Sequence, residues 1–227
     1  MSDLVQYYPM FLEGTALTIL ITVIGSVIGI LLGLLFVMMR LSKVKVISAI
    51  GRIYISVVRG TPSMIQVMLI YYTLAKSLDL PTIQFLGSSL DRIIPGSIAL
   101  GINSGAYVAE IFRAGITSIP VGQTEAGISL GLSERETMQS IVLPQALRNV
   151  LPALGNEFIT LVKESSVLFY IGVQEVTAQA LAVGGTLYNF IPPLLVSAGI
   201  YFILTFVLSQ VFAVMEKKMG AKYTRLN

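Results

Sequence analysis

Long apolar segments divide this chain and restrict what it can fold into more than any other feature. Four segments are strongly apolar, and a fifth, which carries two glutamates and a lysine, is weaker. Because a helix needs about 20 mostly apolar residues to cross a bilayer, each segment is expected to span a membrane. We therefore predict an all-α polytopic membrane protein with a single domain, residues 1–227, and five transmembrane helices over about 16–39, 61–78, 94–118, 150–171 and 190–214.

Composition agrees with this class and excludes several kinds of chemistry. Charged residues make up 12% of the chain, about half of the roughly 25% that is typical of soluble domains. The absence of cysteine and histidine excludes thiol catalysis, disulfides and metal sites built from these residues. An intramembrane hydrolase would need a Ser/His or paired Asp arrangement, and no Asp lies in a predicted span. We therefore expect no enzyme activity, no metal site and no nucleic-acid partner.

Basic residues predict the orientation, since lysine and arginine concentrate on the cytoplasmic side of membrane proteins. One side of the predicted spans carries only Lys76 and Arg92. The other side carries eleven basic residues, which are Arg40, Lys43, Lys45, Arg52, Arg59, Arg135, Arg148, Lys217, Lys218, Lys222 and Arg225. The N-terminus is therefore expected outside and the C-terminus in the cytoplasm.

The segment between the first two spans has its own pattern. Apolar residues recur there near helical spacing beside the basic residues, at Val44, Ile47, Ile50, Tyr54, Val57 and Val58. This pattern predicts an interfacial helix that lies on membrane lipid. Contact with a second subunit is the alternative.

The cytoplasmic loop over about 118–148 contains strong helix boundary signals. Pro120 is expected to open one helix, and Gly131 suits the left-handed residue that follows a helix end. Ser133 and Glu136 have the spacing of a capping box that starts a second helix, and Pro144 is expected to end it. These signals predict a rigid knob of two short helices, with an ordinary amphipathic surface loop as the alternative.

A motif in this loop resembles a known signature. Glu-Ala-Gly at 125–127, then Gly131, then Ile-x-Leu-Pro at 141–144, resembles the EAA loop of the membrane subunits of ABC importers. Gly127 replaces that family's second alanine and is expected to loosen the first helix by up to about 1 kcal/mol at an exposed site. The resemblance implies that the loop docks on a cytoplasmic ATPase through Glu125, Ala126, Gly131, Leu143 and Pro144.

Flanking motifs at 59–62, 106–113, 118–123 and 143–148 resemble the polar amino acid uptake branch of that family. The resemblance implies the type I importer permease fold in a bacterial inner membrane. Its further partners are an extracellular amino acid-binding protein and a second permease subunit, either a copy of this chain or a homologue. The chain has no Gly-x-x-x-x-Gly-Lys-Ser/Thr loop, so ATP and Mg²⁺ are expected on the separate ATPase and no cofactor on this chain.

Polar residues inside the predicted spans mark the expected cargo path, since charges in a bilayer usually face a cavity or a partner. Helical spacing places Glu157, Thr160 and Glu164 on one face of their span, and places Asn103, Tyr107 and Glu110 on one face of theirs. Counting from the span ends puts Asn103 near Lys163 and Glu164, and Glu110 nearer Glu157. The predicted substrate-binding residues are Asn103, Glu157, Lys163 and Glu164.

In such a pocket the carboxylates would bind an amino acid's ammonium, and Lys163 would bind its carboxylate. The excess of acidic over basic side chains favours a basic amino acid. Two structural alternatives stay open: Glu110 pairs with Arg113, and Lys163 pairs with Glu157, Glu164 or a partner subunit. For the whole chain, the alternatives are an ion-gradient-driven amino acid carrier working as a dimer, and a purely structural subunit.

One further pattern concerns packing. Gly25, Gly29 and Gly33 recur every four residues along the first predicted span. Small residues at this spacing let a second helix approach closely, so the first span is expected to pack tightly against another helix.

Overall fold

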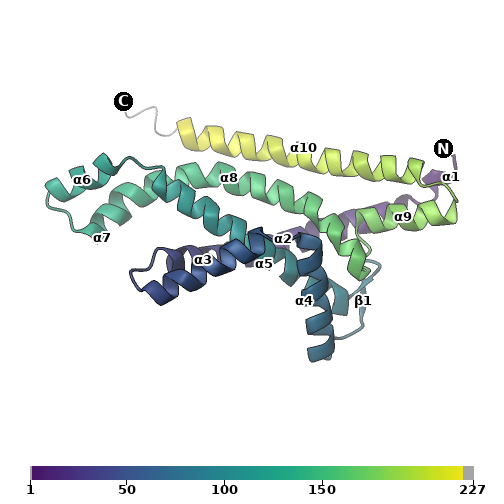
Figure 1. The fold of residues 1–227 in the computed structure, drawn as a ribbon. Coiled ribbons are helices and arrows are strands. Elements are labelled where there is room, and N and C mark those ends of the chain that lie inside the picture. The colour runs from purple at the N-terminus through teal and green to yellow at the C-terminus, as the bar shows by residue number, and fades with distance from the viewer. Residues whose placement is uncertain (1, 222–227) are drawn as a thin grey trace.

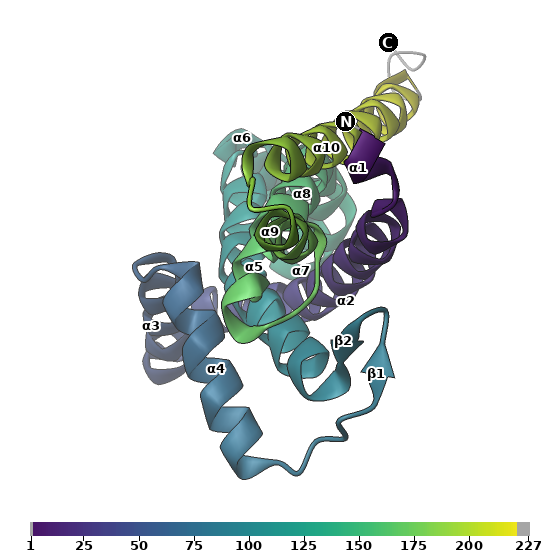
Figure 2. The same ribbon diagram turned by 90° about the vertical axis from the view of Figure 1, so that its right-hand side faces the viewer.

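Four long helices lie side by side and form the body of the molecule (Figure 1). The computed structural model describes residues 2–221. A short α1 (Ser2–Val5) precedes the four, which are α2 (Tyr8–Arg40), α5 (Leu90–Thr117), α8 (Leu143–Glu164) and α10 (Ile191–Ala221). The α6–α7 region projects at one end of this body, and the described N-terminal residues lie at the opposite end (Figure 1). The end view in Figure 2 shows α5 and α8 near the centre.

The predicted close approach along the first span is confirmed, and the second helix is α5. A Cβ on Gly25 would lie 3.3 Å from Leu100, and one on Gly33 would lie 2.4 Å from a methyl of Val108. The approach is reciprocal, because a Cβ on Gly101 would lie 2.5 Å from Ile28. Missing side chains on both helices therefore let the two backbones come together, which fixes α5 as a buried central helix.

The helix expected between the first two spans forms. Helix α3 (Lys45–Arg59) runs back along α2. Ser48 donates a hydrogen bond to the carbonyl of Arg40, and the Tyr54 ring stacks on Phe36 with centroids 3.6 Å apart. The Tyr54 hydroxyl then reaches the carbonyl of Ile102 on α5 at 2.6 Å. Periodicity identified the helix but could not specify which way it turned after residue 44.

The second predicted span, 61–78, forms as a single helix, and a sharp break separates it from α3. Helices α3 and α4 (Ser63–Ser77) are bent by 109° at a break that holds Gly60, Thr61 and Pro62. Helix α4 therefore stands across the long helices (Figures 1 and 2). Pro62 is the N-cap residue rather than the first helical residue, and the Thr61 hydroxyl donates back to Val57 at 2.8 Å.

The fourth predicted span, 150–171, starts earlier than expected, because its helix continues back into the knob. Residues of α7 (Glu134–Thr137) continue through a π-helical turn (Met138–Val142) into α8, so Pro144 does not end a helix. Proline is tolerated in the first turn of α8 because its missing amide would have no partner there. After α8 the chain forms a 3₁₀ helix (Ser165–Ile171) and α9 (Val176–Thr186), which was not predicted. A small hairpin of β1 (Gln84–Phe85) and β2 (Ser88–Ser89) was also not predicted.

By length and apolar composition, two helices of the described chain could each cross a membrane: α2, and residues 191–218 of α10. Two bent pairs also qualify when each is taken as one span, which are Lys45–Arg59 with Ser63–Ala75 and Glu134–Ile171 with Val176–Thr186. The central α5 does not qualify. Because neighbouring helices rather than lipid surround it, small and polar residues such as Ala99, Asn103 and Ser104 replace the large apolar ones on its buried faces.

Some of the basic residues that predict the orientation lie outside the part of the chain that the structure describes. Lys222 and Arg225 lie outside the described residues, and so does the side chain of Lys76. Arg40 is the last residue of α2, and Arg59 is the last residue of α3.

Candidate functional site: a helical knob and a polar interior

The corner of the knob follows from one glycine. Helix α6 (Val121–Ser129) ends at Leu130, and Gly131 adopts φ +86°. The amide of Leu132 then donates to the carbonyl of Gly127 at 3.2 Å, and the amide of Gly131 donates to Ile128 at 2.9 Å. This is the hydrogen-bond pattern of a glycine-terminated helix, in which the left-handed residue satisfies carbonyls that the helix leaves open. The predicted corner is confirmed.

The predicted capping box is also confirmed. The Ser133 oxygen accepts from the amide of Glu136 at 3.3 Å, and the Glu136 carboxylate accepts from the amide of Ser133 at 2.9 Å. The hydroxyl and amide of Ser133 both donate to this carboxylate and lower the pKa of Glu136. The start of α7 is therefore fixed next to the corner.

Gly127 corrects an expectation, because it is buried rather than exposed. An added Cβ would lie 2.7 Å from Cγ2 of Thr137 and 3.0 Å from Ile141. Thr137 is fully buried, and its branched side chain has little freedom to move. Glycine at 127 thus allows α6 to pack on the π-helical arm, where we had predicted a loosened helix.

The outer face of α6 is free of internal contacts. Glu125 and Ala126 are exposed, and the Glu125 carboxylate forms no hydrogen bond or ion pair with any other described residue. Ile128 is 50% exposed and Leu130 is 82% exposed at the tip. Leu143 and Pro144 are exposed at the start of α8, and a hydrogen bond of 3.2 Å from Gln145 to Gln123 joins the two arms of the knob.

The polar interior is arranged differently from the predicted facing stripes. Ser104 on α5 donates a hydrogen bond of 2.8 Å to the carboxylate of Glu157 on α8. Nearer the knob, Gly115 packs on Val150, since an added Cβ would lie 2.3 Å from its methyl. These contacts set Asn103 near the level of Glu157, and not of Glu164 as predicted. Residue counting failed because α8 continues into the knob, so its true start could not be located from hydropathy.

Asn103 faces α4, close to the break between α3 and α4. It is 4% exposed, and its amide donates to Gln66 on α4 at 3.0 Å. The Gln66 amide in turn donates to the carbonyl of Val58 at 2.7 Å and to the Thr61 hydroxyl at 2.7 Å. A helix break leaves backbone groups without their usual partners, and polar side chains must satisfy them in an apolar environment. Gln66 does so here, and Asn103 holds the Gln66 side chain in place.

Lys163 lies in a third place. It lines an open hollow of about 520 Å³ formed by the end of α8, the 3₁₀ helix, α9 and α10. The polar side chains of the wall are those of Lys163, Ser166, Tyr170, Thr177, Ser197 and Tyr201. Lys163 forms no ion pair with Glu157 or Glu164 in the described chain. Three of the four predicted substrate residues therefore lie at different places: Asn103 at the break, Glu157 against α5 and Lys163 at the hollow. Glu164 follows Lys163 in the chain but does not line the hollow.

A buried acid beside the hollow was not predicted from the sequence. Glu175 is fully buried, and its carboxylate accepts hydrogen bonds from the amides of Thr177 and Ala178, each at 2.9 Å. The Tyr201 hydroxyl also donates to it, at 2.5 Å, and Tyr201 lines the hollow. Glu175 precedes α9 as its N-cap residue, so the acid followed by Val-Thr-Ala was the available signal for a helix start.

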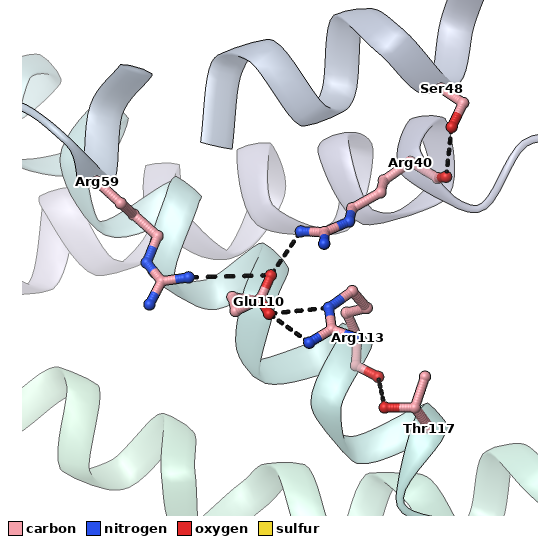
Figure 3. A network of polar contacts seen from close by, with 6 residues as sticks. All are labelled: Arg40, Ser48, Arg59, Glu110, Arg113 and Thr117. Carbon is pink, nitrogen blue, oxygen red and sulfur yellow. Dashed lines mark hydrogen bonds and ion pairs between the residues drawn. The ribbon is translucent and has the colours of Figure 1, made fainter. Parts of the chain in front are cut away.

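Glu110 is held by arginines (Figure 3). Arg113 donates to Oε1 through Nε at 2.8 Å and Nη2 at 2.5 Å, and Arg40 donates to Oε2 at 2.6 Å. The pairing of Glu110 with Arg113, left open above, is therefore confirmed. Arg59 lies 3.9 Å from Oε2 and 5.3 Å from the centre of the Tyr107 ring. The polar stripe of α5 thus faces α2, α3 and α4, and not α8.

The bundle, the knob and the polar interior together define a membrane permease subunit of an importer. The chain belongs to the family of binding-protein-dependent transport system inner membrane components, whose family model matches residues 25–221. It is a multi-pass inner-membrane protein.

Relatives within this family are amino acid permeases. The chain is 37% identical to the arginine transport system permease protein ArtQ of Bacillus subtilis (strain 168), over 96% of each chain. It is 34% identical to the L-cystine permease protein TcyB of the same organism, over 96% of this chain and 90% of that protein. It is also 34% identical to a putative glutamine permease protein GlnP of Rickettsia felis, over 95% and 97%.

Solved structures agree with the fold. The chain matches a crystal structure of an amino acid ABC transporter with histidines at a TM-score of 0.86 and 38% identity, covering 95% of this chain and 96% of that one. A match to the MetNI methionine ABC transporter at a TM-score of 0.73 and 15% identity supports the fold alone.

Proposed function

We propose that this chain is the membrane-spanning subunit of an ATP-driven importer for a polar amino acid, with a basic amino acid favoured. The observation that carries the proposal is the knob: a rigid corner with an exposed face on Glu125, Ala126 and Leu130, joined without a break to α8. Relatives named for arginine, glutamine and cystine support an amino acid as cargo.

Five spans are proposed, with the N-terminus outside and the knob and C-terminus in the cytoplasm. They are α2, the bent pair α3–α4, α5, α8 and α10, which together form a single domain over residues 1–227. The buried surface of α5 and the positive residues near the ends of α2 and α3 support this topology.

Coupling is proposed to pass from a separate ATPase into α8. Glu125, Ala126 and Gly131 would contact the ATPase, and Leu143 and Pro144 would complete the same face. Since α7, the π-helical turn and α8 form one continuous helix, a push on the corner would move Glu157 and Lys163 as well. The ATP and Mg²⁺ belong to that partner chain.

The substrate path is proposed to involve Glu157, Glu164 and Lys163, with Asn103 acting at the helix break. Lys163 offers a cation for a substrate carboxylate in the open hollow, and the two glutamates offer charge for an ammonium or a basic side chain. A second permease subunit, either another copy or a homologue, and an extracellular binding protein complete the proposed assembly.

Reconstitution tests this function against the ion-driven alternative. The purified chain is incorporated into liposomes with an ATP-binding subunit and a binding protein of its own organism, and uptake of radiolabelled arginine, glutamine and cystine is measured. Uptake into the liposomes should require ATP on the side of the membrane that carries the ATP-binding subunit. It should be accompanied by stimulated ATP hydrolysis. Uptake by the permease alone, driven by an ion gradient, would show that the chain is a carrier instead.

A further inference from the structure

A small polar hollow, here called the hairpin hollow, lies toward the end of the bundle opposite the knob (Figure 1). Its walls are the β1–β2 hairpin, the first turn of α5 and the loop after the 3₁₀ helix, and Figure 2 shows the hairpin beside the start of α5. Its volume is about 300 Å³, at the lower end of the range for small-molecule sites. None of the described side chains in its wall is apolar, although the chain is 55% apolar. The hairpin hollow therefore suits a polar ligand and not an acyl chain.

Asp91 lines the hairpin hollow with a carboxylate that has no partner. Its Oδ1 is buried, and within the described residues the side chain takes part in no hydrogen bond or ion pair. Ser89, in the same wall, is 8% exposed, and its hydroxyl is also buried without a partner. Burial of a polar group without a hydrogen bond is costly, so such groups in a native protein call for a bound partner. Two neighbouring groups of one wall are thus available to a ligand.

Arg92 brings the opposite charge to the hairpin hollow. Its Nη1 donates to the carbonyl of Gly172 at 3.1 Å, which is the only hydrogen bond of this side chain within the described residues. Gly172 leaves room for the guanidinium, because an added Cβ would lie 2.5 Å from Nη1. Arg92 and Asp91 form no ion pair with each other. Since a guanidinium has several N–H donors in a planar fork that matches a carboxylate, Arg92 can bind a carboxylate in the hollow.

A second acidic side chain borders the hairpin hollow. Gly87 lines it, and a Cβ on Gly87 would lie 3.5 Å from Oε2 of Glu13 on α2. Glu13 is exposed, and it forms no ion pair with any other described residue. Two carboxylates and one guanidinium complement a ligand that has two cationic groups and one carboxylate. A basic amino acid has these three charges.

Hydrogen bonds hold the walls of the hairpin hollow in place. The backbone amide of Gln174 donates to the Ser88 hydroxyl at 2.6 Å, which ties the loop after the 3₁₀ helix to the hairpin. The amide of Leu90 donates to the carbonyl of Ile83 at 3.0 Å, which ties the start of α5 to the segment before β1. The walls are thus joined without a ligand, and this reduces the ordering that binding must cost.

We propose that the hairpin hollow binds a basic amino acid. Arg92 pairs with the carboxylate of the amino acid, Asp91 with its α-ammonium and Glu13 with its cationic side chain. In the proposed topology the hollow lies on the side of the extracellular binding protein, apart from Glu157 and Lys163, so it would receive cargo before the interior residues do. The cargo class and the outer location rest on the proposed function, whereas binding itself requires neither ATP nor the ATPase.

Protection of a single thiol tests this proposal on the purified full-length chain. Because the chain has no cysteine, Thr82→Cys introduces one thiol into the wall of the hairpin hollow. Its rate of modification by a hydrophilic maleimide is measured with arginine, with agmatine, which lacks the carboxylate, and with glutamine, which lacks the cationic side chain. Arginine should slow the modification at a lower concentration than either analogue. Ser77→Cys, at an exposed position that does not line the hollow, should react at the same rate with and without arginine.

Further substitutions in the Thr82→Cys chain assign the three charges. Asp91→Asn should raise the arginine concentration for half protection roughly tenfold, because a charge-assisted hydrogen bond is lost. Asp79→Asn removes the same charge at an exposed position outside the hollow and should change this concentration little. Arg92→Gln should weaken protection by arginine but not by agmatine. Glu13→Gln should weaken protection by arginine but not by glutamine.

Several results would overturn the proposal. They include no protection of Thr82→Cys by arginine, equal protection of Ser77→Cys, and equal losses in Asp91→Asn and Asp79→Asn, which would indicate diffuse attraction of cations. Protection by sodium chloride without amino acid would assign Asp91 to an inorganic cation. Protection by the binding protein without amino acid would assign the hollow to a side chain of that partner. If Asp91→Asn does not fold, the comparisons made with Arg92→Gln and Glu13→Gln decide.

Failure of this site and failure of the proposed function give different results, since the thiol measurement uses the chain without ATP. Absence of protection together with ATP-dependent uptake in liposomes would refute the hairpin hollow as a binding site and leave the importer function intact. Protection by arginine together with uptake that needs only an ion gradient would support the site and refute the ATP-driven function.

Discussion

Ser104 and Glu157 join the two central helices through a hydrogen bond of 2.8 Å, and this bond sets the register of α5 against α8. It also places a carboxylate of α8 against the most buried helix of the bundle. Because α8 continues into the knob, Glu157 is the polar interior residue most directly linked to the surface proposed for the ATPase.

Replacement of this carboxylate should change what the transporter accepts. Glu157→Gln is expected to reduce uptake of arginine by at least tenfold while glutamine uptake changes less, since the amide keeps the shape but not the charge. Ser104→Ala is the matched control: it removes one hydrogen bond, worth about 1 kcal/mol, and leaves the charge. Competitive uptake of the two labelled amino acids measures the ratio. An unchanged ratio in Glu157→Gln would remove Glu157 from the substrate path.

Lys163 should recognise the substrate carboxylate. Lys163→Met is expected to weaken binding of arginine strongly and to leave agmatine, which lacks the carboxylate, unaffected. Ser166→Ala, in the wall of the same hollow, controls for a general change in the hollow. Calorimetric titration of both ligands on the assembled transporter gives the two affinities. Equal losses for arginine and agmatine would mean that Lys163 acts only on the fold.

Gly127 should be intolerant of the alanine that the EAA signature carries. Gly127→Ala places a methyl 2.7 Å from Thr137 and is expected to destabilise the chain by about 1–3 kcal/mol through overpacking. The double variant Gly127→Ala/Thr137→Ala should recover most of this loss. Gly122→Ala lies in the same helix with open space around it and should be neutral or slightly stabilising. Melting temperatures in detergent test the three variants, and equal values for Gly127→Ala and Gly122→Ala would contradict the packing argument.

The capping box should make the corner sensitive to acid. The folded state lowers the pKa of Glu136, so its stabilising effect is present above the ordinary glutamate range and is lost as pH falls toward the lowered pKa. Limited proteolysis of the loop should therefore accelerate as the pH falls through that range. Glu136→Gln should show much less of this acceleration, whereas the exposed Glu134→Gln should behave like the unmodified chain. Identical pH profiles for all three would rule out the capping box as the cause.

Local rules predicted the knob well. Gly131, Ser133 and Glu136 act through backbone conformation and short-range hydrogen bonds, which the order of residues determines directly. The glycine repeat at 25, 29 and 33 succeeded for a similar reason, since close approach needs only missing side chains at a helical spacing.

Predictions that depended on the depth of a residue along its span, or on the residues packed against it, failed. Counting from the span ends placed Asn103 at the depth of Lys163 and Glu164. The start of α8 could not be located from hydropathy, because the helix continues back through Pro144 into α7. The direction of α3 depends on Tyr54 reaching Phe36 and Ile102, contacts that no periodicity reveals. Gly127 looked exposed because only the folded knob brings Thr137 against it.

Coupling through the corner is the central claim, and ATP hydrolysis measured together with uptake tests it most directly. In reconstituted transporter, Glu125→Arg and Gly131→Val should leave the chain folded but should uncouple uptake from ATP hydrolysis. Glu125→Arg reverses the charge of the exposed face, and Gly131→Val strains the corner at φ +86°. Gly131→Asn, which tolerates this conformation better, should retain most of the coupling. Normal coupled uptake in both Glu125→Arg and Gly131→Val would contradict the account.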